Sequence, residues 1–294
     1  MPGGQMGRLV LVAVVWVLLA SCSSSGDAGG GAAATTSSPS QATHASDQYP
    51  NAIAVLGHSG ATGYDSDPKR PGVDARENSW ATGDNPAVDS VYLRLLALNP
   101  AVRGHNTNVA VAGTGVDDLA GQADQALAAT PLPELFLVQS VDNDIRCDGS
   151  DADNYAPFAA TLTDVLKKLT TGAPKAKILI VSSPWSTVQN YAQVAARLPG
   201  PRAANSGTGP CDLFDPAGKP MPGHWRTLEG ITLHYLGELR SVCAKFPTCR
   251  YDNDALYQMK IGTADITPSD GAHLTIAGLR KQAALEWRIL ALEH

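Results

Sequence analysis

The sequence predicts an α/β domain of three layers, α/β/α, with a central and mostly parallel sheet. Short apolar runs alternate along the chain with longer stretches of helical spacing, which indicates repeated strand–helix units. One run, Ile-Leu-Ile-Val at 178–181, is a continuous apolar segment rich in β-branched residues and suited to a strand that is covered on both faces. Residues 51–294 are numerous enough to bury one sizeable core, so we expect a single folded domain there.

The elements follow from these runs and from the residues that stop them. Strands are predicted at 52–56, 108–112, 134–140, 177–182 and 249–252. Helices are predicted at 88–98, 116–129, 155–170, 188–198, 225–244 and 276–292, with a long Pro- and Gly-rich loop at 199–223. Gly57 ends the first strand and Pro100 stops the first helix. Asp117 and Asp118 fall in the first turn of the second helix, where the helix dipole favours negative charge.

The first fifty residues predict export and a lipid anchor. Arg8 precedes an apolar run of twelve residues, 9–20, which is too short to span a bilayer comfortably and is typical of a signal peptide over 1–21. The sequence Leu19-Ala20-Ser21-Cys22 resembles a bacterial lipobox, in which Cys22 is lipidated; a plain signal peptide is the alternative. Residues 22–50 are a predicted flexible linker, because Ser, Gly, Ala, Thr and Pro bury little apolar surface. The expected location is the outer face of the bacterial cell membrane, held by the lipid anchor only.

Composition and charge exclude several classes. The hydrophobic fraction is 44% and the charged fraction 17%, which excludes a wholly disordered chain and a coiled coil. Lys and Arg number 22 against 28 Asp and Glu, a net charge of −6, and no basic run is present. We therefore expect no nucleic-acid partner, because phosphate backbones select clustered positive charge.

The cysteines predict two disulfides. Besides Cys22 the chain has four, an even number in an exported protein, and four allow three pairings. Cys243 and Cys249 are six residues apart and can close a small loop, so we expect that pair, together with Cys147–Cys211. A metal site is disfavoured because no CxxC pair or thiol cluster is present.

Residues with chemical potential gather just after the predicted strands. The segments are Gly57-His58-Ser59-Gly60, Gly113-Thr114-Gly115, Val141-Asp142-Asn143-Asp144 and, before the last helix, Asp270-Gly271-Ala272-His273. Parallel sheets place their sites at the carboxyl ends of strands. A Ser, glycine amides, an Asn and an Asp/His pair together suit acyl transfer. A G-x-S-x-G elbow is excluded because position 61 is Ala61, and a phosphate-binding loop because no Lys lies near Ser59.

The four segments together resemble the SGNH, or GDSL, hydrolase superfamily. Its blocks read G-D-S, a central Gly, G-x-N-D and D-x-x-H. The four positions that name the family are occupied by Ser59, Gly113, Asn143 and His273. Nearby text such as Asn78-Ser79-Trp80 is similar to that of secreted actinobacterial lipoprotein-type members. The resemblance implies a flavodoxin-like SGNH fold.

Two positions depart from the family pattern. His58 replaces the Asp of G-D-S, and Val141 replaces the Gly of G-x-N-D. The Asp of G-D-S is not the triad carboxylate, because that role falls to Asp270. We therefore expect His58 to reshape the turn that holds the Ser, and Val141 to affect the backbone beside Asn143.

The resemblance implies a serine esterase for short acyl or carbohydrate acetyl esters. Ser59 is the expected nucleophile, His273 the base and Asp270 the residue that orients it. The oxyanion hole is expected from the amides of Ser59 and Gly113 and the side chain of Asn143. No metal or organic cofactor is expected, and the chain is expected to be monomeric.

Alternatives remain open from the sequence alone. One is a non-catalytic envelope binding protein on the same fold. Another is an acyltransferase that uses the same acyl-enzyme. Trp80, Trp185 and Trp225 are candidates for stacking on a sugar ring, with packing as the competing interpretation.

Overall fold

The computed structural model describes residues 49–290. The predicted signal peptide, Cys22 and nearly all of the predicted linker therefore lie outside the described residues. Within the described part, no helix combines the length and the apolar character needed to cross a membrane.

A five-stranded sheet, in which every neighbouring pair is parallel, forms the centre of the fold. Its strands are β1 (Ile53–Gly57), β2 (Asn106–Asn108), β3 (Leu135–Gln139), β4 (Lys177–Val181) and β5 (Cys249–Tyr251). The spatial order is β2-β1-β3-β4-β5, which is the flavodoxin-like order. The order reverses between β1 and β3, and ligands of such sheets bind at this switch point.

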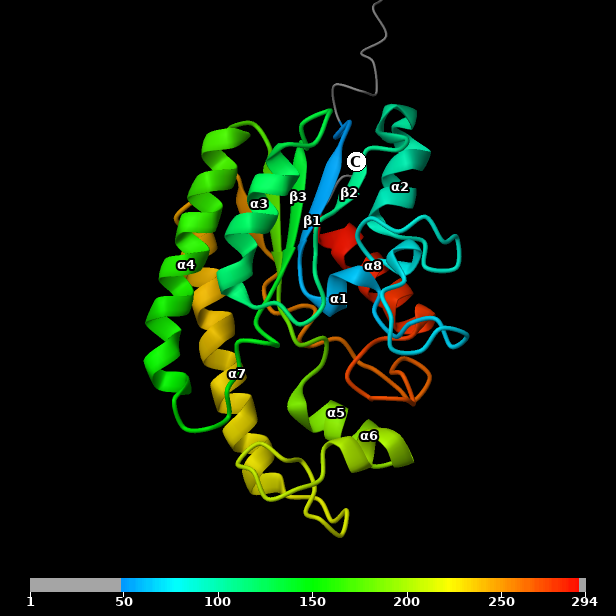
Figure 1. Cartoon of the computed structure of the whole chain (residues 1–294), viewed down its shortest axis with the longest axis vertical. Coiled ribbons are helices and arrows are strands. Elements are labelled where there is room, and N and C mark those ends of the chain that lie inside the picture. Colours follow the sequence, from blue (N-terminus) through cyan, green and yellow to red (C-terminus); the bar gives the residue numbers. More distant parts are fainter. Residues whose placement is uncertain (1–48, 291–294) are drawn as a thin grey trace, which may run out of the picture. The chain divides into compact units, whose positions relative to one another are not determined.

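Helices cover both faces of the sheet, as the alternation of elements predicted. They are α1 (Ser59–Thr62), α2 (Val91–Leu98), α3 (Leu119–Leu127), α4 (Asp151–Gly172), α5 (Val188–Ala195), α6 (Pro199–Ala204), α7 (Pro222–Cys243) and α8 (Ile276–Leu290). Helices α3, α4 and α7 lie on one side and α2 and α8 on the other (Figure 1). Alternate strand residues divide between the two cores: Phe136 and Val138 face the first, Leu135 and Leu137 the second.

Two predictions about elements are wrong, and each error has a physical reason. The second strand is Asn106–Asn108, not the apolar run at 108–112. It is an edge strand of three half-buried polar residues, so no apolar run marks it. The predicted loop at 199–223 contains α6, whose first residue is a proline, because proline is well suited to a helix start.

The two predicted disulfides are present. Cys147 pairs with Cys211 and Cys243 pairs with Cys249. The first joins the loop before α4 to the loop between α6 and α7. The second closes the six-residue step from the end of α7 into β5.

Candidate active site

The site is assembled beyond the carboxyl ends of the strands, where α1 and the loop before α8 meet (Figure 1). Ser59 is the first residue of α1, which follows β1 after His58 alone. Its Oγ lies 2.8 Å from Nε2 of His273, and Nδ1 of His273 lies 2.6 Å from Oδ2 of Asp270. In the tautomer that satisfies both contacts, the Ser59 hydroxyl donates to Nε2 and Nδ1–H donates to the carboxylate. The structure thus brings all three residues predicted for the triad together.

The Asp270 carboxylate is held ionised by its neighbours. Burial pushes its pKa upward, but hydrogen bonds from His273, Thr267 and the amide of Ala272 outweigh burial and lower the pKa to about 2. The Ala272 amide donates to Oδ1 at 2.9 Å, and the Thr267 hydroxyl donates to the same oxygen. A carboxylate that stays charged at neutral pH can orient an imidazole and stabilise the imidazolium.

Two residues near His273 escaped the sequence analysis. Thr267 supports Asp270 as described, and Tyr64 places its ring 4.8 Å from the His273 ring at an interplanar angle of 51°. Thr267 lies three residues before Asp270, whereas Tyr64 is distant from His273 in the sequence. No spacing rule could have indicated them.

Asn143 lies near Ser59 and contacts the loop that contains Gly113. The Asn143 side-chain amide donates to the carbonyl of Thr114 at 2.8 Å, which leaves its second N–H available. Gly113, next in the chain to Thr114, is exposed and has a φ of +83°, a conformation that favours glycine. Ser59 and Asn143 line one cavity, whereas Gly113 is outside its lining. The amide of Ser59 is in the first turn of α1, where backbone N–H groups have no partner within the helix.

Asp144 connects the two loops that carry the predicted oxyanion-hole residues. Its carboxylate accepts from the amide of Val116 at 2.9 Å and from that of Val141 at 3.2 Å. Burial raises its pKa to about 6 even though both amides act in the opposite direction. One carboxyl group therefore holds the loop after β3 against the loop that contains Gly113.

Val141 adopts a backbone conformation that favours glycine. Its φ is +109°, in the region that L side chains rarely occupy, and the side chain is fully buried. The backbone beside Asn143 therefore keeps a glycine-like course and carries the strain of a β-branched residue.

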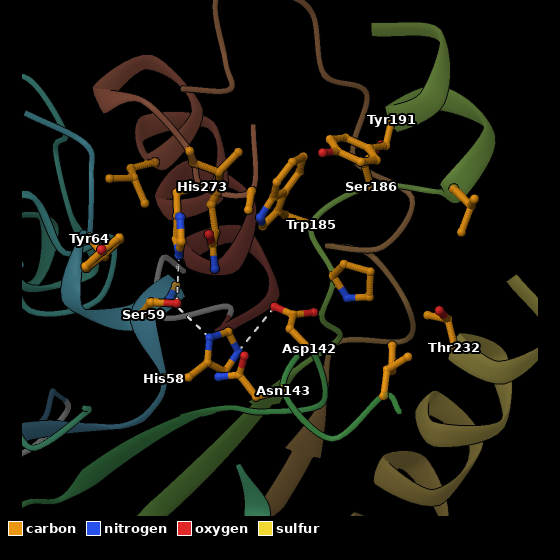
Figure 2. Close-up of a pocket in the computed structure, with 18 of the residues that line it drawn as sticks. His58, Ser59, Tyr64, Asp142, Asn143, Trp185, Ser186, Tyr191, Thr232 and His273 are labelled. Carbon is orange, nitrogen blue, oxygen red and sulfur yellow. Dashed lines mark hydrogen bonds and ion pairs between the residues drawn. The ribbon is translucent and has the colours of Figure 1, made fainter. Parts of the chain in front are cut away.

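His58 connects the start of α1 with the loop after β3. Its Nδ1 accepts from the amide of Gly60 at 3.1 Å, so the ring caps the helix that begins with Ser59. Its Nε2 lies 3.3 Å from Oδ2 of Asp142, and the Ser183 hydroxyl donates to that same oxygen at 2.6 Å. Burial lowers the pKa of His58, against the opposing effect of Asp142. The neutral ring with its proton on Nε2 fits both contacts, and Figure 2 shows it between Ser59 and Asp142.

A cavity of about 340 Å³ opens directly from the triad. Ser59 and His273 form one end of its lining, and side chains from α5 and α7 complete it (Figure 2). Of the three tryptophans considered for sugar stacking, Trp185 lines this cavity. Trp80 is fully buried and its Nε1 donates to Gln139, so it is a core residue. Trp225 packs against a small buried cluster that includes Leu213 and Phe214, and its Nε1 donates to the Leu213 carbonyl.

Asp151, the first residue of α4, holds the loop before that helix through its carboxylate. Asp151 is buried, and its two oxygens accept from the amides of Arg146 and Cys147 at 2.8 and 2.9 Å. In the described part of the chain no group of three or more His, Cys, Asp or Glu side chains is arranged to hold a metal ion.

Comparisons with known proteins place the fold. No protein-family model and no curated protein sequence matches this chain. Among solved structures, a putative GDSL-like lipase from Parabacteroides merdae matches with a TM-score of 0.50 at 14% identity, covering 82% of this chain and 96% of that one. A phospholipase A1 from Streptomyces albidoflavus matches with a TM-score of 0.47 at 14% identity, covering 81% of this chain and 98% of that one. An acetyl xylan esterase matches with a TM-score of 0.48 at 14% identity, covering 81% of this chain and 99% of that one. At these identities the likeness concerns the fold: the chain has a parallel α/β/α architecture like that of the GDSL-like lipase.

Proposed function

We propose that this chain is a serine ester hydrolase of the SGNH type. The observation that carries the proposal is the unbroken hydrogen-bond chain from Ser59 through His273 to Asp270. It lies at the sheet's switch point and opens into a cavity large enough for a small ligand.

The proposed reaction proceeds through an acyl-enzyme. Ser59 Oγ attacks the ester carbonyl while His273 Nε2 takes the hydroxyl proton, giving a tetrahedral oxyanion. The amides of Ser59 and Gly113 and the second N–H of Asn143 are the proposed donors to that oxyanion. Collapse breaks the bond to the alcohol oxygen, which leaves with the proton from His273. Water, deprotonated by the same nitrogen, then attacks the acyl-enzyme, releases the carboxylic acid and restores Ser59.

The proposed location is the outer face of the cell membrane. It rests on the signal-like residues 1–21 and on Cys22 in its lipobox-like setting. The two disulfides agree with it, because such bonds persist in oxidising, exported environments.

The experiment compares the full chain with Ser59→Ala, using p-nitrophenyl butyrate hydrolysis and labelling by a fluorophosphonate. We expect Ser59→Ala to lose both turnover and label. The matched control is Ser186→Ala, because Ser186 lines the same cavity and its hydroxyl is 2.9 Å from Asn190 Oδ1, not at His273. That variant should still be labelled. Label and turnover that survive in Ser59→Ala would remove Ser59 from the reaction.

A further inference from the structure

The cavity beside the triad has walls made mostly of carbon. Beyond Ser59 and His273 its apolar lining includes Trp185, Val188, Tyr191, Leu228, Leu274 and Leu279. Trp185 and Tyr191 meet edge to face, with ring centroids 5.5 Å apart at 84°. Trp185 and Val188 are 7% and 3% exposed, so these walls are fixed by packing as well as facing the cavity.

Two polar side chains in the walls that α5 and α7 supply are already paired within the protein. The Thr232 hydroxyl donates to the carbonyl of Leu228 at 2.9 Å. The Tyr191 hydroxyl donates to the Gly271 carbonyl at 2.7 Å and accepts from Asn205 at 2.8 Å. In Figure 2, Thr232 and Tyr191 lie across the pocket from Ser59. A sugar ring placed against these two side chains would lose hydration of its hydroxyls without gaining matched partners from them, which is costly.

We infer that this cavity binds the acyl chain of the ester, and that the preferred substrates carry medium-length aliphatic acyl groups. The inference rests on the proposed serine hydrolase function and narrows its substrate class. A hydrocarbon chain attached to the carbonyl at Ser59 can extend toward α5 and α7, where the walls offer dispersion contacts and exclude water.

The cavity volume sets the chain length. The space of about 340 Å³ is at the small end of the range for ligand pockets. We therefore assign acyl chains of medium length, about six to ten carbons, to this cavity.

The test is a series of p-nitrophenyl esters from acetate to palmitate with the full chain. We expect kcat/KM to rise about fourfold for each added methylene, since one buried methylene is worth about 0.8 kcal/mol. The rise should end between hexanoate and decanoate. A profile that is flat, or highest at acetate, overturns the inference and leaves the esterase intact.

Substitutions on α7 test where the acyl chain of the substrate binds. Leu228→Trp introduces a larger side chain into the cavity wall, so kcat/KM for octanoate should fall at least tenfold while that for acetate changes less than about twofold. Leu233→Trp is the control, because Leu233 lies on the same helix, is 48% exposed and is outside the cavity lining. Leu233→Trp should have the same dependence of kcat/KM on acyl-chain length as the wild-type protein. Equal losses on acetate and octanoate in Leu228→Trp contradict the assignment.

A second variant keeps the assignment testable if Leu228→Trp does not fold. Leu228→Ala enlarges the cavity and should move the optimum to longer chains. Failure of the acyl assignment is distinguishable from failure of the function. Ser59-dependent fluorophosphonate labelling with no chain-length preference overturns only the former, whereas absence of both label and turnover overturns both.

Discussion

At the scale of single residues, His58 is the departure from the family pattern with the clearest structural role. It caps α1 through Gly60 and contacts Asp142, which precedes the predicted oxyanion residue Asn143. One ring thus ties the nucleophile loop to the loop after β3. The usual Asp could serve as the helix cap, since Asp is a good N-cap residue, but it would bring a second carboxyl group toward Asp142.

His58→Asp is therefore expected to lower kcat, although it installs the usual family residue. Two carboxylates a few ångströms apart near a protein surface repel by about 3 kcal/mol at an effective dielectric constant of 20. We expect kcat to drop about 10- to 100-fold with little change in KM, measured on p-nitrophenyl butyrate. The control is His58→Asp combined with Asp142→Asn, which removes the repulsion and should recover most of the loss. A double variant as slow as the single one contradicts the electrostatic account.

A second prediction at the scale of residues concerns backbone strain at Val141. Replacing it by Gly relieves a φ of +109° but removes a fully buried side chain. Relief of about 1–2 kcal/mol offsets much of the cavity cost. Val138→Gly is the matched control, because Val138 is equally buried and lies within β3 without a positive φ. We expect Val141→Gly to cost at least 2 kcal/mol less than Val138→Gly in urea unfolding, and equal costs would mean that the strain is negligible.

At the scale of elements, the two disulfides differ in how much chain they constrain. Cys147–Cys211 spans 64 residues and Cys243–Cys249 spans 6. The loss of chain entropy in the unfolded state grows with loop length. The long bridge also fastens the loop after α6, which packs on the cavity-lining helix α5 through Leu213 and Phe214.

Removing the long bridge should cost more stability than removing the short one. The loop-entropy relation gives about 4 kcal/mol for Cys147→Ala with Cys211→Ala and about 2 kcal/mol for Cys243→Ala with Cys249→Ala. Urea unfolding of the two double variants under non-reducing conditions measures both values. The reverse order would show that native-state packing around the short bridge, not loop length, sets its contribution.

The elements also show how far sequence reasoning reaches. Strands β1, β3 and β4 were predicted because buried parallel strands need continuous apolar residues, whereas β2 was missed because an edge strand does not. The proximity of Ser59, His273 and Asp270 could be predicted from the resemblance and the strand-end rule. The contact between His58 and Asp142 did not, since side-chain pairing across two strand ends depends on tertiary distances that no spacing shows. The contribution of α5 and α7 to the cavity walls could not be predicted for the same reason.

At the scale of the whole molecule, two carboxyl groups of the site give stability opposite dependences on pH. Asp270 has a folded-state pKa of about 2, below its ordinary 3.8, so its stabilisation is present above about pH 4 and is lost as pH falls through 2. Asp144 has a folded-state pKa of about 6, above 3.8, so its favourable contribution is present below about pH 4 and is lost as pH rises through 6.

Asp144→Asn should therefore flatten the pH dependence between 4 and 6. A shift from 3.8 to about 6 corresponds to about 3 kcal/mol at most, which the wild-type free energy of unfolding should lose over that interval relative to the variant. Urea unfolding at closely spaced pH values measures the difference. A wild-type curve parallel to that of Asp144→Asn would show that Asp144 keeps an ordinary pKa.

The hydrogen bond between Ser59 and His273 joins residues 214 positions apart, one at the start of the folded domain and the other just before its final helix. The ribosome therefore makes Ser59 long before it makes His273. A chain released before residue 270 has Ser59 without Asp270 and His273. Under the proposed function such a partial chain could not cleave esters, so ester cleavage would report chains that have been synthesised past His273 and have folded.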